Sequence, residues 1–475
     1  MVANNIAIAS YFALIVGMGF LAMRRTRNPA DFAVAGRRLG PVLYSGTLAA
    51  VVLGGGSTIG TARLGYEYGI SAFWLVFMFG AGILVLSLVF GRKLAGLRVY
   101  TVSEMLSKRF GAGSRYISAV VMIAYDLMIA VTATIGIGSV FDVVLDIPRI
   151  WALIFGGGIV VLYSAVGGMW ALTLTDIAQF GVLVLGFFVI MLPLTLARVD
   201  GVSGLATRLP ESFFDPVAIG GGTILTFFLV YFFGILIGQD IWQRAFTARS
   251  AKVTVWAGVA AGAICIIFGG AIALMGAAAR AILPGLSNSD NALPALTREV
   301  MPDGLAGIVL AAILAALMST ASACILAVST ITSFDLLGRN RRASAKKAVN
   351  QSRLITLGTG LVVIVIAALV GDVLAALTIA YNVLVGGLFV PIVGALFWKR
   401  ATTRGALLSM TLGIGTVAVF MIRDGLMAST PIYYSLIVSV VAFVLTSLVD
   451  KHPTERPDDQ PVDVTDTKSA EVRVL

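Results

Sequence analysis

Two apolar stretches of the chain carry residues that could do chemistry, and the first is residues 49–60, AAVVLGGGSTIG. Its segment is long enough to cross a membrane, yet three glycines and two hydroxyl residues interrupt it. Glycine inside a helix costs roughly 1 kcal/mol relative to alanine, so the run predicts an unwound turn. In hydrocarbon such a turn survives only when protein buries it or when it lines a polar cavity. The stretch therefore predicts either an ion and substrate site or a glycine-lined packing seam.

The second stretch, AALMSTASACILAVSTITSFDLL, places hydroxyl residues in an apolar segment. Ser319 and Thr320 are adjacent, and Ala316 and Ser322 lie three residues to either side of Ser319, so all share one helix face. With carbonyls freed by a broken helix alongside, these hydroxyls would supply about five oxygens, which suits a hard monovalent cation better than calcium. Alternatively, the hydroxyls bond their own backbone or a neighbouring helix.

Charged residues inside apolar segments are functional hypotheses by default, because a carboxylate at mid-membrane costs about 2.5–3.5 kcal/mol on insertion scales. Asp176 either contributes to function or caps the cytoplasmic end of its helix. Asp126 lies ~16 Å into its helix, near the midplane. It holds an amine of the substrate or pairs with another helix or a basic side chain. Arg63 and Glu67, four residues apart, predict an ion pair, although Arg63 could instead attract an anionic substrate.

Composition identifies a polytopic membrane protein. Only 12% of the 475 residues are charged, against about 25% in soluble domains, and the mean hydropathy is +0.98. The net charge of +10 comes from basic residues that mostly lie between apolar spans, a positive-inside pattern that argues against nucleic-acid binding. Cys265 and Cys324 lie in apolar spans and predict neither a disulfide framework nor a transition-metal site. His452 is the sole histidine, so a histidine-based metal site or triad is excluded, and no phosphate loop indicates ATP. We therefore expect no enzyme.

The basic loops alternate with thirteen predicted spans, which places the N-terminus outside and the C-terminus in the cytoplasm. The predicted spans are residues 6–23, 42–66, 72–90, 116–140, 151–166, 171–196, 221–241, 253–279, 305–332, 354–370, 375–397, 406–421 and 433–448. The strongest inside signal is the loop with Arg339, Arg341, Arg342, Lys346, Lys347 and Arg353. Residues 450–475 are rich in Pro and Asp and predict a disordered cytoplasmic tail.

Several motifs, in order, resemble the sodium/solute symporter family: DFAVAGRRLG after the first span, YSAVGGMWALTLTDIAQF at 163–180, GQDIWQRAFTA at 238–248 and ALMSTASACILAVSTITSFDL at 316–336. The resemblance extends from about Asp31 to Met410. It implies an all-α membrane fold with a five-plus-five inverted repeat and broken helices at mid-membrane. Residues 1–449 would form one transmembrane domain, with repeats at about 42–196 and 221–397. The resemblance also implies sodium-coupled uptake.

The resemblance carries a sodium site onto this chain. Its ligands would be the carbonyls of Ala50, Leu53 and Ala316 and the hydroxyls of Ser319 and Thr320. Asp176 and Ser322 match positions that serve a second ion or the exit path in some members. Ala323 stands where a second hydroxyl would help, which argues against a second sodium. Sodium is then the co-transported ion, and no organic cofactor is expected.

The substrate side of the glycine break would be Gly54, Gly55, Gly56, Ser57 and Thr58. A helix N-terminus there favours a carboxylate. If Asp126 also faces the cavity, the solute is an amino acid or similar zwitterion; otherwise a short monocarboxylate or pantothenate fits better. A sugar is disfavoured, because Gly234 stands where the sugar-transporting branch places its stacking tyrosine. Tyr231, in the aromatic run 227–233, could form a lid over the substrate or face lipid or the core.

These interpretations predict a sodium-coupled symporter of a small organic solute in the plasma or inner membrane. It would act by alternating access as a single protomer, with the solute, sodium and the bilayer as its partners. The nearest alternative is a proton-coupled or uncoupled transporter of a carboxylate or sugar. A transporter-like membrane sensor is an alternative of a different class, although no soluble signalling domain is visible in the sequence.

Overall fold

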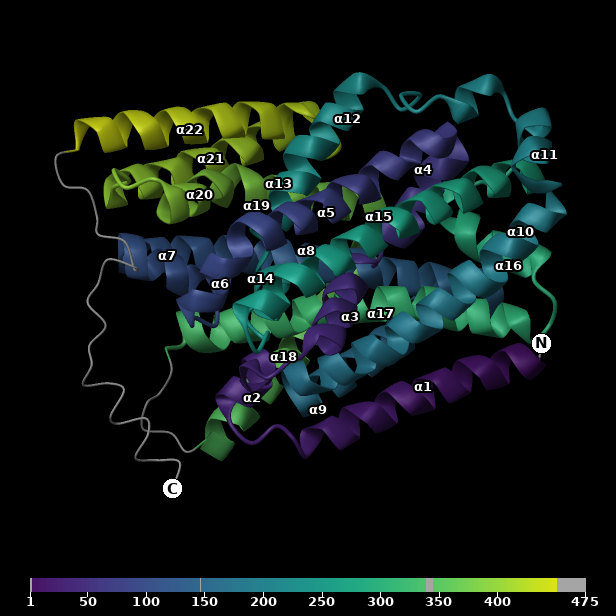
Figure 1. Ribbon diagram of the computed structural model, residues 1–475, viewed down its shortest axis with the longest axis horizontal. Helices are drawn as coiled ribbons and strands as arrows, with labels where there is room; N and C mark the ends of the chain where they lie inside the picture. Colours follow the sequence, from purple (N-terminus) through teal and green to yellow (C-terminus); the bar gives the residue numbers. More distant parts are fainter. Residues whose placement is uncertain (1, 146, 339–344, 451–475) are drawn as a thin grey trace.

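The computed structural model describes residues 2–145, 147–338 and 345–450, and within these ranges the regular elements are all helical (Figure 1). Ten helices are long and apolar enough to cross a membrane, and a bent pair adds an eleventh. This confirms the predicted all-α membrane fold. Part of the predicted inside loop, including Arg339, lies outside the described residues, as do His452 and nearly all of the predicted tail.

The α-helices follow one another with short connections. Their bounds are α1 Val2–Met23, α2 Pro29–Val34, α3 Pro41–Val52, α4 Thr61–Tyr68, α5 Phe73–Val85, α6 Gly91–Leu97, α7 Val102–Phe110, α8 Ala112–Leu145, α9 Arg149–Leu183, α10 Leu192–Arg198, α11 Gly201–Arg208, α12 Gly221–Phe227, α13 Phe233–Ile235, α14 Gln239–Ala245, α15 Ala251–Ile282, α16 Ala292–Val300, α17 Leu305–Ile331, α18 Ala345–Leu369, α19 Val373–Leu384, α20 Val390–Phe397, α21 Thr403–Asp424 and α22 Thr430–Val449.

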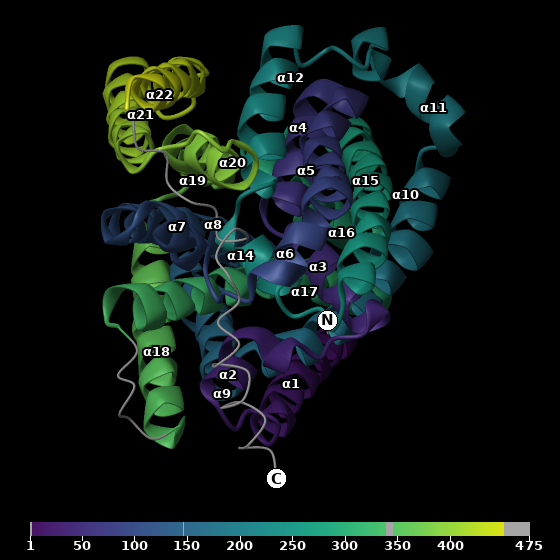
Figure 2. The same ribbon diagram turned by 60° about the vertical axis from the view of Figure 1, so that its left-hand side comes forward.

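Helix α17 forms the centre of the bundle, and nearly all of its side chains are buried. It packs against α1, α3, α8, α9 and α18. Figures 1 and 2 place α1 at one edge of the molecule and the paired helices α21 and α22 at the opposite edge. The hydroxyl residues of α17 therefore lie deep in protein rather than against lipid.

The predicted break in the second span is present. Helix α3 ends at Val52, the chain is irregular to Gly55, and one wide turn over Gly56–Gly60 leads into α4. The glycines allow close packing: the side chain of Thr320 occupies the place of a Cβ on Gly54, and a Cβ on Gly55 would lie 2.9 Å from the carbonyl oxygen of Thr132. The packing seam and the helix break are therefore one feature.

A second break divides the predicted span 221–241. Helices α13 and α14 meet across three residues, and the chain bends by 44° there. The ring of Tyr381 lies directly against Gly234, so a side chain at position 234 would collide with it. Between the two breaks, α9 runs through the predicted fifth and sixth spans and is kinked at Gly168, whose φ is +56°.

Candidate functional site

The hydroxyl pair of α17 meets the C-terminal end of α3. Ser319 Oγ donates to the carbonyl of Ala50 at 2.8 Å and to that of Ala316 at 2.9 Å. Thr320 Oγ1 donates to the carbonyl of Val51 at 2.5 Å and lies 3.5 Å from the carbonyl oxygen of Ala316. Both hydroxyl residues are buried. The structure thus brings together four of the five predicted sodium-site residues.

Leu53 is the fifth predicted residue, and no contact in the described chain joins its carbonyl to α17. It is fully buried, and its N–H closes the last turn of α3 on Ala49. The Val51 carbonyl, which sequence reasoning missed, accepts from the Thr320 hydroxyl instead. The sequence could have indicated Val51, because the last four carbonyls of any helix lack partners within it and Val51 lies near the predicted break.

Two further carbonyls at the break are satisfied locally. The Ser57 hydroxyl donates to the carbonyl of Val52, and the Thr58 hydroxyl donates to that of Gly54 at 2.5 Å. These hydroxyls give their hydrogens to the break itself. The bonds help an irregular turn persist inside the membrane, where an unsatisfied backbone group costs several kcal/mol.

A narrow cavity adjoins the hydroxyl pair. Four predicted substrate residues line it, namely Gly54, Gly55, Gly56 and Ser57. The facing helices contribute Phe79, Thr132, Asp240, Thr320 and Tyr381. Thr58 and Asp126 are buried nearby but are not among the lining residues. Tyr231 lines a separate hollow together with Arg63, and its hydroxyl lies 3.3 Å from that of Thr378.

Asp176 forms a buried ion pair with Arg244 of α14. The carboxylate lies 3.1 Å from Nη2 of Arg244 and accepts a hydrogen bond from the Thr47 hydroxyl. Arg244 Nε also donates to the Thr47 carbonyl at 3.2 Å, so α3, α9 and α14 are joined. The Asp176 carboxylate thus bonds two side chains on other helices, Thr47 of α3 and Arg244 of α14. Ser322 donates to the carbonyl of Ser319 at 3.0 Å.

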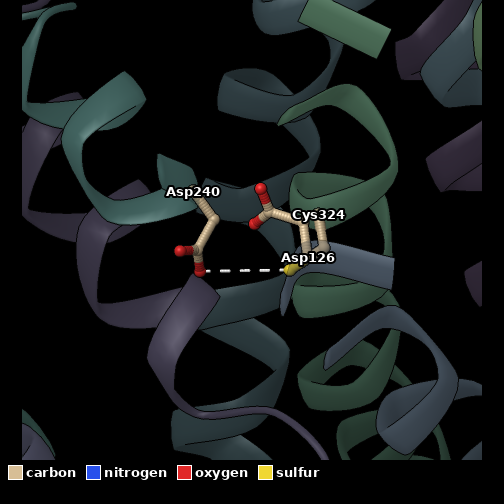
Figure 3. Close-up of side chains that lie close together, drawn as sticks. All are labelled: Asp126, Asp240 and Cys324. Atoms are coloured by element: carbon tan, nitrogen blue, oxygen red, sulfur yellow. Dashed lines mark hydrogen bonds between the residues drawn. The ribbon is translucent and has the colours of Figure 1, made fainter. Parts of the chain in front are cut away.

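Asp126 lies beside a second carboxylate that sequence reasoning missed. Figure 3 shows Asp126 of α8, Asp240 of α14 and Cys324 of α17; one carboxylate oxygen of each aspartate and the cysteine sulfur lie within 4.8 Å of one another. Neither carboxylate forms an ion pair within residues 2–145, 147–338 and 345–450, so the interpretation of Asp126 as the partner of a basic side chain is wrong. An acidic residue within the predicted span 221–241 was the signal that could have identified Asp240.

Arg63 forms the predicted pair with Glu67 at 3.2 Å, and the structure adds two partners. Its Nη1 atom lies 2.9 Å from Asp372 and 3.4 Å from Asp290. Burial raises the pKa of Asp290, and the nearby positive charge of Arg63 opposes this rise. Burial also pushes the pKa of Asp372 upward, but the hydrogen bond and charge of Arg63, together with the backbone N–H groups of Ala375 and Leu374, outweigh it and lower that pKa below its usual value. The cluster ties α4 to the connections before α16 and α19.

An all-helical membrane protein with a broken helix against a cluster of carbonyls and hydroxyls has the architecture of a secondary transporter. Residues 32–413 match the model of the sodium:solute symporter family. The chain belongs to this family, and it is a sodium-coupled solute symporter of the membrane.

Relatives match nearly the whole chain at low identity. The sodium/glucose cotransporter of Vibrio parahaemolyticus is 26% identical, covering 97% of this chain and 92% of the relative. The sodium/pantothenate symporter of Escherichia coli is 27% identical, with 92% and 95% covered. The sodium/proline symporter of the same organism is 27% identical, with 94% of each covered. A solved Na⁺-coupled sialic acid symporter shares the fold, with a TM-score of 0.81, 20% identity, and 96% and 98% covered.

Proposed function

We propose that the coupling sodium binds between α3 and α17, at the carbonyls of Ala50, Leu53 and Ala316 and the hydroxyls of Ser319 and Thr320. The observation that carries this proposal is the direct contact of both hydroxyls with the unpartnered end of α3. Ser319 donates to the carbonyls of Ala50 and Ala316, which would themselves be ligands, and Thr320 donates to the adjacent Val51 carbonyl. Rotation of each O–H away from its carbonyl would turn the oxygen lone pairs of both groups toward the cation.

The proposed inverted repeat goes with thirteen proposed membrane crossings. The eleven spans counted by length become thirteen when α3 with α4 is separated from α5 with α6, and when α9 is divided at Gly168. Two contacts favour the division of α9. Arg149, at the start of α9, donates to the carbonyl of Val370 at 3.2 Å, and Gly167, at the kink, accepts from Thr26, which follows α1, at 2.8 Å. In the predicted topology Val370 and Thr26 lie at opposite sides of the membrane, so the first half of α9 would cross it. The first helix of each proposed repeat, 42–196 and 221–397, is broken, as inverted-repeat transporters require. The basic loops favour an outside N-terminus and a cytoplasmic C-terminus for the domain 1–449.

Sodium between α3 and α17 would couple its gradient to the neighbouring cavity. The ion would hold the break against α17, and this fixes the wall formed by Gly54 and Thr320. Alternating access would then move one set of helices against the other. A membrane potential of 100 mV adds about 2.3 kcal/mol of driving force per sodium. Asp176, held by Arg244, would act on the inner exit path by joining α9 to α14.

The solute we favour is an amino acid or similar zwitterion with a carboxylate. The wide turn after Gly55 begins at the cavity and favours an anionic group, and Asp240 supplies an acidic wall for an amine. A sugar is disfavoured because the Tyr381 ring occupies the space at Gly234. Tyr231 packs on Tyr381 with ring centroids 5.4 Å apart, which suits a lid on the outer side.

The test is uptake of labelled proline, acetate and pantothenate into proteoliposomes, with sodium or potassium outside and with or without a proton gradient. We expect sodium-dependent uptake, competition by zwitterions rather than sugars, and loss of sodium dependence in Ser319→Ala/Thr320→Ala. The matched control is Thr411→Ala/Thr416→Ala, which removes one exposed and one half-buried hydroxyl from α21. Unchanged sodium dependence in the first variant would refute the sodium site. Uptake that follows the proton gradient would favour the proton-coupled alternative.

A further inference from the structure

Charged groups buried around the cavity do not balance. Asp126, Asp176, Asp240 and Arg244 are each at most 3% exposed, and Arg244 is committed to Asp176 at 3.1 Å. If all three carboxylates are ionised, one guanidinium and one sodium leave one positive charge missing, which a proton on the acidic pair or a further cation must supply. An uncompensated charge buried in protein costs several kcal/mol. Either a proton or a cation other than the coupling sodium would therefore complete this site.

The deficit is located at Asp126 and Asp240. Neither oxygen of Asp126 has a hydrogen-bond partner of regular geometry within the described ranges, although the backbone N–H of Asp240 is turned toward it. Asp240 accepts from the Tyr125 hydroxyl at 3.2 Å and lies 3.9 Å from the sulfur of Cys324. Asp240 lines the cavity, and Asp126 lies beside Asp240 (Figure 3).

Aromatic rings surround the same side of the cavity. Phe79 and Tyr381 both line it, with ring centroids 5.6 Å apart. Tyr125, which contacts Asp240, meets Tyr381 edge to face at 5.2 Å. Ring faces attract organic cations within about 6 Å, and the attraction grows when water is excluded. Carboxylates combined with aromatic walls thus fit an alkylammonium group.

We propose that Asp240, reinforced by Asp126 and walled by Phe79 and Tyr381, binds an ammonium group of the transported solute. This inference rests on the proposed function and narrows it: the cargo must carry a positive charge on nitrogen, whether as a zwitterion or as a cation. A second sodium fits less well, because Cys324 offers sulfur and Tyr125 already bonds one oxygen of Asp240. Acetate, pantothenate and glucose lack the required group.

The test compares two solutes of nearly identical shape. Glycine betaine and 3,3-dimethylbutanoate differ by the replacement of the quaternary nitrogen with carbon, and tetramethylammonium supplies the cation alone. Each is titrated against the purified full chain in saturating sodium, and the shift in Tm is recorded. We expect glycine betaine to bind at least about tenfold more tightly than its carbon analogue, a difference of about 1.4 kcal/mol. Asp240→Asn should reduce this preference to near parity.

The control is Asp142→Asn, which removes an exposed carboxylate from α8, the helix of Asp126, and should keep the preference. A measurement without solute is independent: in sodium-free buffer Asp240→Asn should raise Tm, because it removes an uncompensated charge, whereas Asp176→Asn should lower it by stranding Arg244. A rise of about 2 °C or more is expected.

Three results would overturn the ammonium site. They are equal binding of the two isosteres, no Tm shift with either ammonium probe in protein that sodium stabilises, or an unchanged preference in Asp240→Asn. A Tm that follows pH but no ammonium probe would assign the carboxylate pair to a proton and overturn it as well. Failure of the proposed sodium site is distinct, because it would leave the sodium-induced Tm shift intact in Ser319→Ala/Thr320→Ala.

Discussion

Gly54→Ala tests whether the helix break and the hydroxyl pair form one sodium site. The added Cβ would lie 2.8 Å from Cγ2 of Thr320 and closer still to its hydroxyl oxygen. Thr320 must then move, and its 2.5 Å hydrogen bond to the Val51 carbonyl is lost. Overpacking costs about 1–3 kcal/mol in stability. Loss of one hydroxyl ligand to a charged group costs a further ~1.5–3 kcal/mol of binding, which weakens sodium roughly 10- to 150-fold.

The assay is the sodium concentration that gives half of the maximal Tm shift in purified protein, repeated for sodium-driven uptake in proteoliposomes. Gly181→Ala is the matched control, because a Cβ there meets no atom within 4 Å on α9. The double variant Gly54→Ala/Thr320→Ala should bind sodium no more weakly than the worse single variant, since both remove the same ligand. A half-saturating sodium concentration that stays at the wild-type value in Gly54→Ala would refute the reasoning.

Two further predictions concern ion pairs. Asp176→Asn and Arg244→Gln should each lower Tm, because each strands a buried partner at a cost of about 3–5 kcal/mol. The double variant should recover part of the loss in thermal unfolding, and strictly additive losses would argue against the pair. Arg63 lowers the pKa of Asp372, so this stabilisation is present above the unfolded pKa of about 3.9 and is lost as pH falls through the lower folded pKa. Arg63→Gln should flatten that acid-side fall in Tm, and unchanged pH profiles would contradict the linkage.

The helix break and the hydroxyl pair could be predicted because each is written in consecutive residues. Three adjacent glycines, which have low helix propensity, interrupt an apolar run, and the helix ends there in the structure. Ser319 and Thr320 stand out for a similar reason, since hydroxyls are conspicuous against an apolar background. Sequence reasoning could not separate a packing seam from a binding site at Gly54, because the answer depended on Thr320 approaching from a distant helix.

The acidic pair shows where local patterns fail. Asp126 was visible as a carboxylate at mid-membrane, and sequence reasoning gave it a substrate amine, a partner on another helix or a basic side chain. The structure instead brings Asp240 beside it, after the second break redirects α14. Arg244, one turn further along α14, turns to Asp176 and leaves the pair without a guanidinium. The packing of α8, α9 and α14 decides which carboxylate pairs with the Arg244 guanidinium.

The sequence by itself determined the membrane environment, the all-helical class and the position of the first helix break, because hydrophobicity and backbone flexibility act over a few residues. It also supplied the hydroxyls and carbonyls of the candidate sodium site, which the fold then joined. Only the tertiary structure decided that Thr320 fills the space beside Gly54, that Tyr381 fills the space beside Gly234, and that Asp126 faces Asp240. These are contacts between distant helices, and close packing and charge balance in a protein interior are properties of the assembled bundle.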